Sequence, residues 1–211
     1  MKAIQLARQV VDEQFAFLEP QERYATIVAD PPWPYDNVDG PRAAPEHRPN
    51  SWDSVAGSVS SANRYGSMSI RALCDLPVKD WAMDNAHLYL WTTNSFMCEA
   101  HEVATAWGFK QKTILTWGKM KANGTPSMKA GYYFRGATEH VLFCVSGRLR
   151  LAGLPAPTLY LSPRLAHSVK PDWVYSVAEQ QSIWPRLEMF ARRRRPGWDA
   201  WGDQVPSLES A

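Results

Sequence analysis

Short apolar runs alternate with amphipathic stretches along most of the chain. Residues 25–29 (ATIVA) and 86–91 (AHLYLW) are nearly continuous apolar runs, which are typical of strands buried on both faces of a sheet. Four more strands are expected at residues 109–117, 138–145, 186–191 and 198–201, and four helices at residues 3–18, 69–75, 95–107 and 172–181. The alternation predicts an α/β domain with a largely parallel central sheet, to which residues 109–145 add an antiparallel edge.

One long segment lacks this periodicity. Residues 35–64 are rich in Pro, Ser, Asn and Gly, and a loop of that length inside a compact domain is usually functional or disordered. We interpret it as a substrate or lid loop. The sequence contains neither an internal repeat nor a domain linker, and 211 residues suit a single domain. We therefore predict one domain over residues 1–211, with residues 205–211 as a tail.

The first buried strand ends in Asp30-Pro31-Pro32-Trp33. In open α/β sheets, ligands bind beyond the carboxyl ends of the strands, where this motif is expected to lie. Prolines carry no N–H, so the Asp30 carboxylate and the Pro31 carbonyl form a pocket of acceptors that suits an NH₂ group. Trp33 adds a flat face on which an aromatic ring could stack. The structural alternative is a proline-rich turn after a core strand, with Trp33 used for packing.

Such a pocket suits the exocyclic amine of adenine. This amine is a poor nucleophile because its lone pair is delocalised into the ring. Hydrogen bonds from both of its hydrogens, to Asp30 and to the Pro31 carbonyl, would favour the pyramidal amine whose lone pair can attack a methyl donor. Electrostatic positioning of this kind is worth about 10²–10³ in rate per group. Asp30 need not be a strong base, since the proton can leave after methyl transfer.

This motif is the first of seven that occur in a fixed order along the chain. They are VADPPW at 28–33, YGSMS at 65–69, LYLWTTN at 88–94, AWGF at 106–109, TEHVLFCVSG at 138–147, HSVKP at 167–171 and MFARRRRPGWDAWGDQ at 189–204. With them, the chain from about residue 24 to residue 204 resembles the MT-A-seventy family of adenine-N6 methyltransferases, in its compact bacterial or phage form. The resemblance implies a Rossmann-like fold, S-adenosylmethionine as the methyl donor, and a permuted motif order with the catalytic strand early and the cofactor strand late.

The resemblance also implies roles for single residues. Asp30, Pro31, Pro32 and Trp33 match the catalytic motif, and Tyr65, Glu139 and Lys170 match positions near the target adenine. The implied cofactor-binding residues are Asp12, Asp30, His167, Ser168, Lys170, Glu188, Phe190, Arg192, Asp203 and Gln204, with no metal. Asp203 stands where the family usually has Asn, which keeps the acceptor but removes a donor, and Asp12 matches by spacing only.

Several of these residues also have purely structural interpretations. Tyr65 can close a turn with the glycine that follows it, and Glu139 can be a solvated strand residue. Lys170, before a proline, can be an exposed residue at the start of a helix. The run Arg193–Arg195 is open between a solvated face and a phosphate contact.

Charge is unevenly distributed along the chain. The formal net charge is only +2, but residues 110–171 contain ten Lys or Arg and a single acid, Glu139. Such a segment predicts contact with a polyanion. Within it, Tyr132, Tyr133 and Phe134 precede Arg135, a mixture that suits stacking on unpaired bases, so we count Arg135 among the substrate-binding residues. The expected partner is a nucleic acid that presents a single-stranded or flipped adenine.

Three functions are carried forward. The first is methylation of adenine in DNA, favoured because the compact form generally resembles DNA modifiers, and the second is the same chemistry on RNA. The third is a silent nucleic-acid-binding subunit, although its catalytic motif would be degraded, whereas all four residues are intact here. Three widely spaced cysteines and the lack of a signal peptide or a membrane-spanning apolar run predict a cytoplasmic protein. A homodimer is left open.

Overall fold

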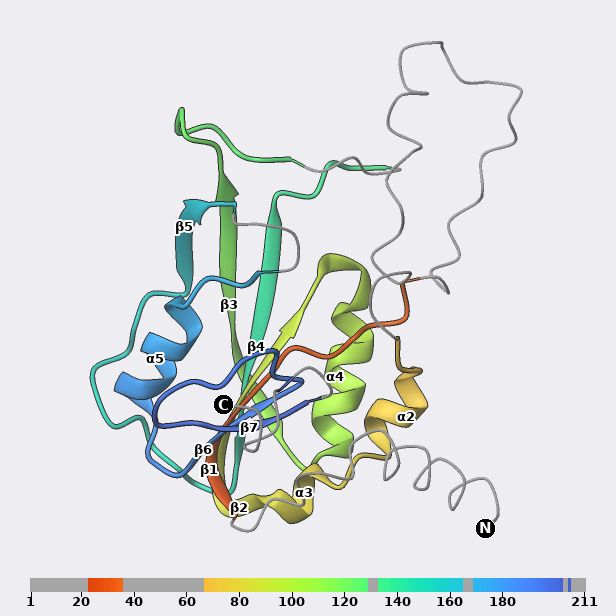
Figure 1. Cartoon of the computed structure of the whole chain (residues 1–211), viewed down its shortest axis with the longest axis vertical. Helices are drawn as coiled ribbons and strands as arrows, with labels where there is room; N and C mark the ends of the chain where they lie inside the picture. The colour runs from red at the N-terminus through yellow and green to blue at the C-terminus, as the bar shows by residue number, and fades with distance from the viewer. Residues whose placement is uncertain (1–22, 36–66, 129–132, 165–168, 203–204, 206–211) are drawn as a thin grey trace.

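The computed structural model describes residues 23–35, 67–128, 133–164, 169–202 and 205, and the fold is a seven-stranded sheet with helices on its faces (Figure 1). In chain order, the elements are β1 (Tyr24–Ala29), α2 (Ile70–Cys74), α3 (Val78–Trp81), β2 (Ala82–Thr92), η5 (Asn94–Phe96), α4 (Met97–Ala106), β3 (Lys110–Met120), β4 (Thr138–Ser146), β5 (Leu159–Pro163), α5 (Trp173–Gln181), β6 (Arg186–Met189) and β7 (Asp199–Trp201).

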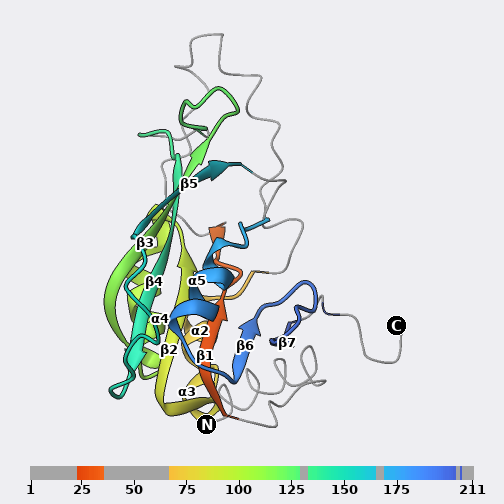
Figure 2. The ribbon, with the colours of Figure 1, turned by 90° about the vertical axis from the view of Figure 1, so that its left-hand side faces the viewer.

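The strand order across the sheet is β5-β3-β4-β2-β1-β6-β7. Figure 2 shows this sheet with β3 and β4 toward one side and β6 and β7 toward the other. β1 pairs in parallel with both β2 and β6, β7 pairs in parallel with β6, and β4 runs antiparallel to its neighbours β2 and β3. The predicted α/β fold with a mostly parallel sheet is therefore confirmed.

The antiparallel strand differs from the prediction in its position. The antiparallel pair of β3 and β4 does not form the outer edge of the sheet, because β5 pairs in parallel with the outer side of β3. β5 was not predicted as a strand. Its side chains alternate between exposed and half-buried, and Leu159 and Leu161 are both 56% exposed, so it lacks the continuous buried run of the central strands. The short helix α3 was also missed.

Two apolar layers explain why the central strands read as nearly continuous apolar runs. On one face, Leu88 packs in a cluster with Leu73 of α2 and Val103 of α4. On the other face, Tyr89 packs in a cluster with Val174 of α5. Figure 1 shows α5 on one side of the strands and α4 with α2 on the other. Because adjacent residues of β2 point to opposite faces, both must be apolar.

The predicted helix at residues 3–18 and residues 36–64 of the predicted loop lie outside the described residues. The predicted helix at 95–107 is divided into the short η5 and α4. Among the helices of the described segments, none has the length and apolar character needed to cross a membrane.

Candidate active site

Charged side chains collect where the central strands reach their carboxyl ends. Asp30 directly follows β1, whose last residue, Ala29, pairs with Leu90 of β2 and Met189 of β6. Pro31 and Pro32 stop the strand at this point because proline cannot continue the ladder of hydrogen bonds. The antiparallel β4 begins at the same edge. This is the edge at which ligands bind in open α/β sheets.

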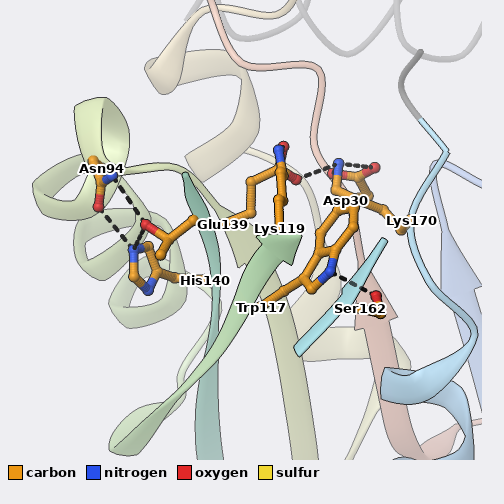
Figure 3. A network of polar contacts seen from close by, with 9 residues as sticks. Asp30, Asn94, Trp117, Lys119, Glu139, His140, Ser162 and Lys170 are labelled. Carbon is orange, nitrogen blue, oxygen red and sulfur yellow. Dashed lines mark hydrogen bonds and ion pairs between the residues drawn. The ribbon is translucent and has the colours of Figure 1, made fainter. Parts of the chain in front are cut away.

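Two lysines and two carboxylates form a continuous chain of opposite charges, which we call the lysine–carboxylate cluster: Lys119, Glu139, Lys170 and Asp30 (Figure 3). Lys170 Nζ donates to both oxygens of Asp30, at 2.9 and 2.8 Å, and lies 3.4 Å from Glu139 Oε2. The other oxygen of Glu139 accepts from the Lys119 ammonium. Four residues from four parts of the chain therefore balance one another.

The cluster has a closed end and an open end. The side chains of Lys119 and Glu139 are 5% and 13% exposed, whereas those of Lys170 and Asp30 are 20% and 23% exposed. Burial alone would lower the pKa of Lys170, but Asp30 and Glu139 outweigh this effect and raise it. The ammonium also lies 5.3 Å from the centre of the Trp91 ring. Lys170 is therefore held as a cation, and the Asp30 carboxylate is its partner at the solvent-facing end.

The acceptor pocket expected at the proline motif is only partly free. The Pro31 carbonyl already accepts the Trp33 amide at 2.9 Å, which leaves it one lone pair for a ligand. The Pro32 carbonyl accepts the amide of Met68 at 2.9 Å. The pocket therefore consists of the Asp30 carboxylate and the remaining acceptor capacity of Pro31.

The prediction that Trp33 offers an open face for stacking on a base is wrong. The residue is 3% exposed, its ring stacks on Phe96 with 5.6 Å between centroids, and its indole N–H donates to the Trp91 carbonyl at 3.1 Å. The indole therefore packs in the core, because a tight turn after β1, closed by the hydrogen bond from the Trp33 amide to the Pro31 carbonyl, directs the side chain inward. In this conformation Trp33 supports the shape of the site and offers no open face to a base.

A second polar group lies beside Asp30, at the end of β6. Glu188 is 8% exposed, and its Oε1 accepts from the Tyr175 hydroxyl at 2.7 Å. Arg195 Nε lies 3.8 Å from Glu188 Oε2, and within the described residues neither atom has a hydrogen-bond partner. Burial raises the pKa of Glu188. A buried acceptor and a buried donor that stay unsatisfied side by side fit a ligand carrying hydroxyl groups, such as the ribose of a nucleoside cofactor.

Other predicted site residues fall into two groups. Arg135 and Arg192 are exposed, while Phe190 is half-buried, has a positive φ of 59° and packs edge-on against Trp201. Tyr65, Asp12, His167, Ser168, Asp203 and Gln204 lie outside the described residues. Arg193 and Arg195 both donate to Asp172, at 3.0 and 2.8 Å, so this part of the arginine run holds the start of α5.

Sequence reasoning missed two side chains that bear on the cluster. Lys119 is one: the predicted strand at residues 109–117 ends before it, whereas β3 extends to Met120 and buries it. Tyr35 is the other. Its ring meets Phe96 edge-on at 5.0 Å. Burial and the carboxylates of Glu139 and Asp30 raise the pKa of its hydroxyl, against the opposing effect of the Lys170 ammonium.

The basic segment is dispersed in space. Lys110 and Lys112 begin β3, and Arg148 and Arg150 follow β4, so these four lie at the opposite end of the strands from Asp30. Lys119 and Lys170 are used within the lysine–carboxylate cluster. Fewer basic residues can therefore form the predicted nucleic-acid face than the charge count suggests. The start of β3 and the end of β4 both lie at the opposite end of the strands from Asp30.

The fold and site define an α/β protein with a charged ligand site at the carboxyl ends of its strands, the arrangement of many nucleoside-cofactor enzymes. A sequence profile of the MT-A70 family matches residues 24–204, and the chain belongs to that family. Its members are S-adenosylmethionine-dependent methyltransferases, so the predicted enzyme class is confirmed.

Individual relatives differ in how much of their length is matched. The type II methyltransferase M.MunI from Mycoplasma sp is 30% identical over 93% of this chain and 83% of its own. The N6-methyladenosine RNA methyltransferase MTA1 of Cryphonectria parasitica is 28% identical over 93% of this chain and 56% of its own. The N(6)-adenine-specific methyltransferase METTL4 of Mus musculus is 25% identical over 86% of this chain and 37% of its own.

Proposed function

We propose that this protein transfers a methyl group from S-adenosylmethionine to the N6 amine of adenine in DNA. The observation that carries the proposal is the Asp30 carboxylate at the open end of the lysine–carboxylate cluster, next to a proline carbonyl with a free lone pair. Both groups are acceptors. An amine with two hydrogens and a lone pair is the substrate that such a pair can orient.

The residues of the chain act by positioning and by charge. Asp30 accepts one amine hydrogen and the Pro31 carbonyl accepts the other, which favours the pyramidal amine and directs its lone pair away from both acceptors. Lys170 donates to both oxygens of Asp30 and so holds the carboxylate in place as an acceptor. Once methylated, the amine nitrogen carries a positive charge and loses one proton, to Asp30 or to water. Neither step needs a base stronger than a carboxylate.

When bound, S-adenosylmethionine would supply a methyl group on a cationic sulfur to the amine lone pair, and the electron pair of the C–S bond would stay with the sulfur. We assign the ribose hydroxyls to Glu188, because its buried Oε2 is an acceptor without a hydrogen-bond partner among the described residues. We assign Phe190, Arg192 and Lys170 to the same cofactor. Asp12, His167, Ser168, Asp203 and Gln204 are further cofactor residues that we propose from the family motifs.

The target base must leave a duplex to reach Asp30, which costs a few kcal/mol. Tyr133 and Phe134 are 78% and 91% exposed beside Arg135, a combination that suits stacking on unpaired bases and contact with phosphate. We propose these residues, with Tyr65 and Glu139, as the substrate-binding side of the site. A single-stranded or flipped adenine is the form of DNA that they favour.

DNA is preferred over RNA for two reasons. The chain resembles the compact bacterial and phage members of the family, and its alignment with the type II methyltransferase spans 83% of that relative, against 56% for the RNA methyltransferase. A silent binding subunit is disfavoured because the four residues Asp30, Pro31, Pro32 and Trp33 are intact and Asp30 is accessible.

The test is methyl transfer from labelled S-adenosylmethionine to matched single-stranded and duplex oligonucleotides made of DNA and of RNA. We expect label in DNA, and digestion of the product should release N6-methyl-2′-deoxyadenosine. The matched control is a DNA in which every adenine already carries the N6-methyl group, which should accept none. Label in RNA alone would replace the proposed substrate, and no label in any oligonucleotide would overturn the proposed function.

A further inference from the structure

The closed end of the lysine–carboxylate cluster contains a lysine with no exposed role. Lys119 is the penultimate residue of β3 and is 4% exposed. Its ammonium contacts Glu139 and lies 4.9 Å from the centre of the Trp117 ring. A buried ammonium is costly unless it is paired, so this lysine and this glutamate are held as a unit. Because Lys119 is buried behind Glu139, any effect it has on the substrate passes through that carboxylate.

Glu139 faces two ammonium groups with its two oxygens. Oε1 accepts from Lys119, while Oε2 lies 3.4 Å from Lys170 Nζ. Lys170 is nevertheless closer to Asp30, at 2.8 and 2.9 Å. The Lys170 ammonium is therefore shared between two carboxylates and bound more closely to the outer one. Figure 3 shows Lys170 between these two partners.

When the substrate amine binds, Asp30 must accept a hydrogen bond from it as well as from Lys170. Lys170 donates to both Asp30 oxygens, but an amine that is to be oriented needs at least one of them as its own acceptor. Lys170 must then give up part of its contact with Asp30. Glu139 is the neighbouring carboxylate to which its ammonium can turn, over a gap of 3.4 Å.

We propose that Lys119 is a positioning residue for methyl transfer: it fixes Glu139 in place so that Glu139 takes over the Lys170 ammonium when the substrate amine binds Asp30. This inference rests on the proposed function. Without Lys119, the Glu139 carboxylate loses the contact that sets its orientation, and the transfer of Lys170 from Asp30 is no longer guided. The effect belongs to the reacting complex, and it should therefore appear in kcat more than in KM.

The test begins with Lys119→Met, and its matched control is Lys112→Met, an exposed lysine on the same strand at the other end. We expect kcat of Lys119→Met to fall by about 10²-fold, the loss typical of a misplaced reacting group, with KM for DNA changed by less than about threefold. Lys112→Met should match the parent. Thermal unfolding and cofactor binding establish the folded fraction of each variant, and Lys119→Arg, which keeps the charge, should retain more activity than Lys119→Met.

A double-mutant cycle separates positioning from a loss of stability. Glu139→Gln removes the carboxylate through which Lys119 acts, so adding Lys119→Met to this variant should lower kcat by less than about threefold. If Lys119→Met costs the same factor in both backgrounds, Lys119 acts independently of Glu139 and the inference is wrong. An active parent with an unimpaired, folded Lys119→Met variant would also overturn it. A parent that methylates no oligonucleotide overturns the proposed function itself, and the role of Lys119 with it.

Discussion

One face of β2 contacts both the lysine–carboxylate cluster and a second buried polar network, and the two differ in charge. His87, Tyr89 and Trp91 are alternate residues of β2, so their side chains share one face. Trp91 lies beneath Lys170 of the cluster. His87 and Tyr89 instead meet Ser182, with His87 Nδ1 and the Tyr89 hydroxyl at 2.7 and 2.8 Å from its Oγ. We call these three residues the His87 network.

The difference between the two groups is charge and access. His87 is fully buried, its second ring nitrogen lies 3.2 Å from the Leu149 carbonyl, and burial lowers its pKa, so the network is neutral and satisfied. The cluster holds four charges and is open at Asp30. A satisfied neutral network rigidifies a core, whereas a charged group that shares its partners can exchange one for a ligand. We therefore expect changes to the cluster to affect activity and changes to the His87 network to affect stability.

Asp30→Asn should give the largest effect. The amide keeps the size of the side chain but places an NH₂ group where the substrate amine needs an acceptor, and it removes the closer of the two carboxylates that face Lys170. We expect kcat to fall by about 10²–10³-fold. Methyl transfer to the DNA substrate measures the loss, and thermal unfolding shows that the variant is folded.

The matched control is Asp84→Asn, which removes a carboxylate whose side chain is 85% exposed and which pairs with Arg23. Exposed ion pairs contribute about 0–1 kcal/mol, so activity and stability should both stay near those of the parent. If Asp30→Asn were as active as Asp84→Asn, the lysine–carboxylate cluster would not be needed for activity and the prediction would be wrong.

His87→Ala is expected to show the opposite pattern. It opens a cavity and removes one of the two hydrogen-bond partners of the Ser182 hydroxyl and the side-chain partner of the Leu149 carbonyl, so the free energy of unfolding should fall by about 2–4 kcal/mol. Activity per folded molecule should be unchanged. Urea denaturation followed by activity measurement in the folded range tests both points. His101→Ala, on the half-buried outer part of α4, serves as the control and should change stability by less than about 0.5 kcal/mol.

The central strands and the position of the Asp30-Pro31-Pro32-Trp33 motif at a strand end could be predicted because they depend on local sequence. Runs such as residues 86–91 are apolar on both faces, and the prolines after Asp30 mark where a strand ends. The edge strand β5 could not be predicted in this way, because Leu159 and Leu161 are exposed and no continuous apolar run marks it.

The contacts of the cluster depend on register, which local sequence does not encode. Trp117 pairs with Glu139 in the ladder between β3 and β4, and the ladder shifts register between Gln111 and Thr113. A shift of one residue would turn Lys119 to the other face of the sheet. The pairing of Lys119 with Glu139 is thus a result of the three-dimensional fold. The roles of Glu139, Lys170 and Glu188 in methyl transfer stay predictions.

The pH dependence of stability sharpens the neutral side of the comparison. The pKa of His87 is lowered by burial from its ordinary value near 6.5, so the unfolded chain binds a proton at a higher pH than the folded protein does. Its contribution is complete above pH 6.5 and is lost as the pH falls toward the lowered pKa. The free energy of unfolding should therefore decrease on acidification, with a share from His87 of at most about 1.4 kcal/mol per pH unit.

Comparison of the parent with His87→Gln, by urea denaturation from pH 7.5 to pH 5, isolates this share, because the lowered pKa of His140 affects both proteins equally. The slope of the variant should be the smaller one. Parallel slopes would mean that the His87 network does not depend on a neutral imidazole.

Tyr35→Phe should give the smallest effect and tests where the cluster ends. The Tyr35 side chain is 41% exposed, its ring rests on Phe96, and burial raises the pKa of its hydroxyl above the ordinary value of 10.0, so it stays neutral through the working pH range. A neutral hydroxyl next to four balanced charges adds one weak contact, and its removal should lower kcat by no more than about fivefold with stability unchanged. A loss near that of Asp30→Asn would instead place Tyr35 on the substrate itself. Tyr35 would then belong to the charged site, which would extend into the segment after the proline motif. The difference between the charged site and the neutral core would then no longer follow β2 alone.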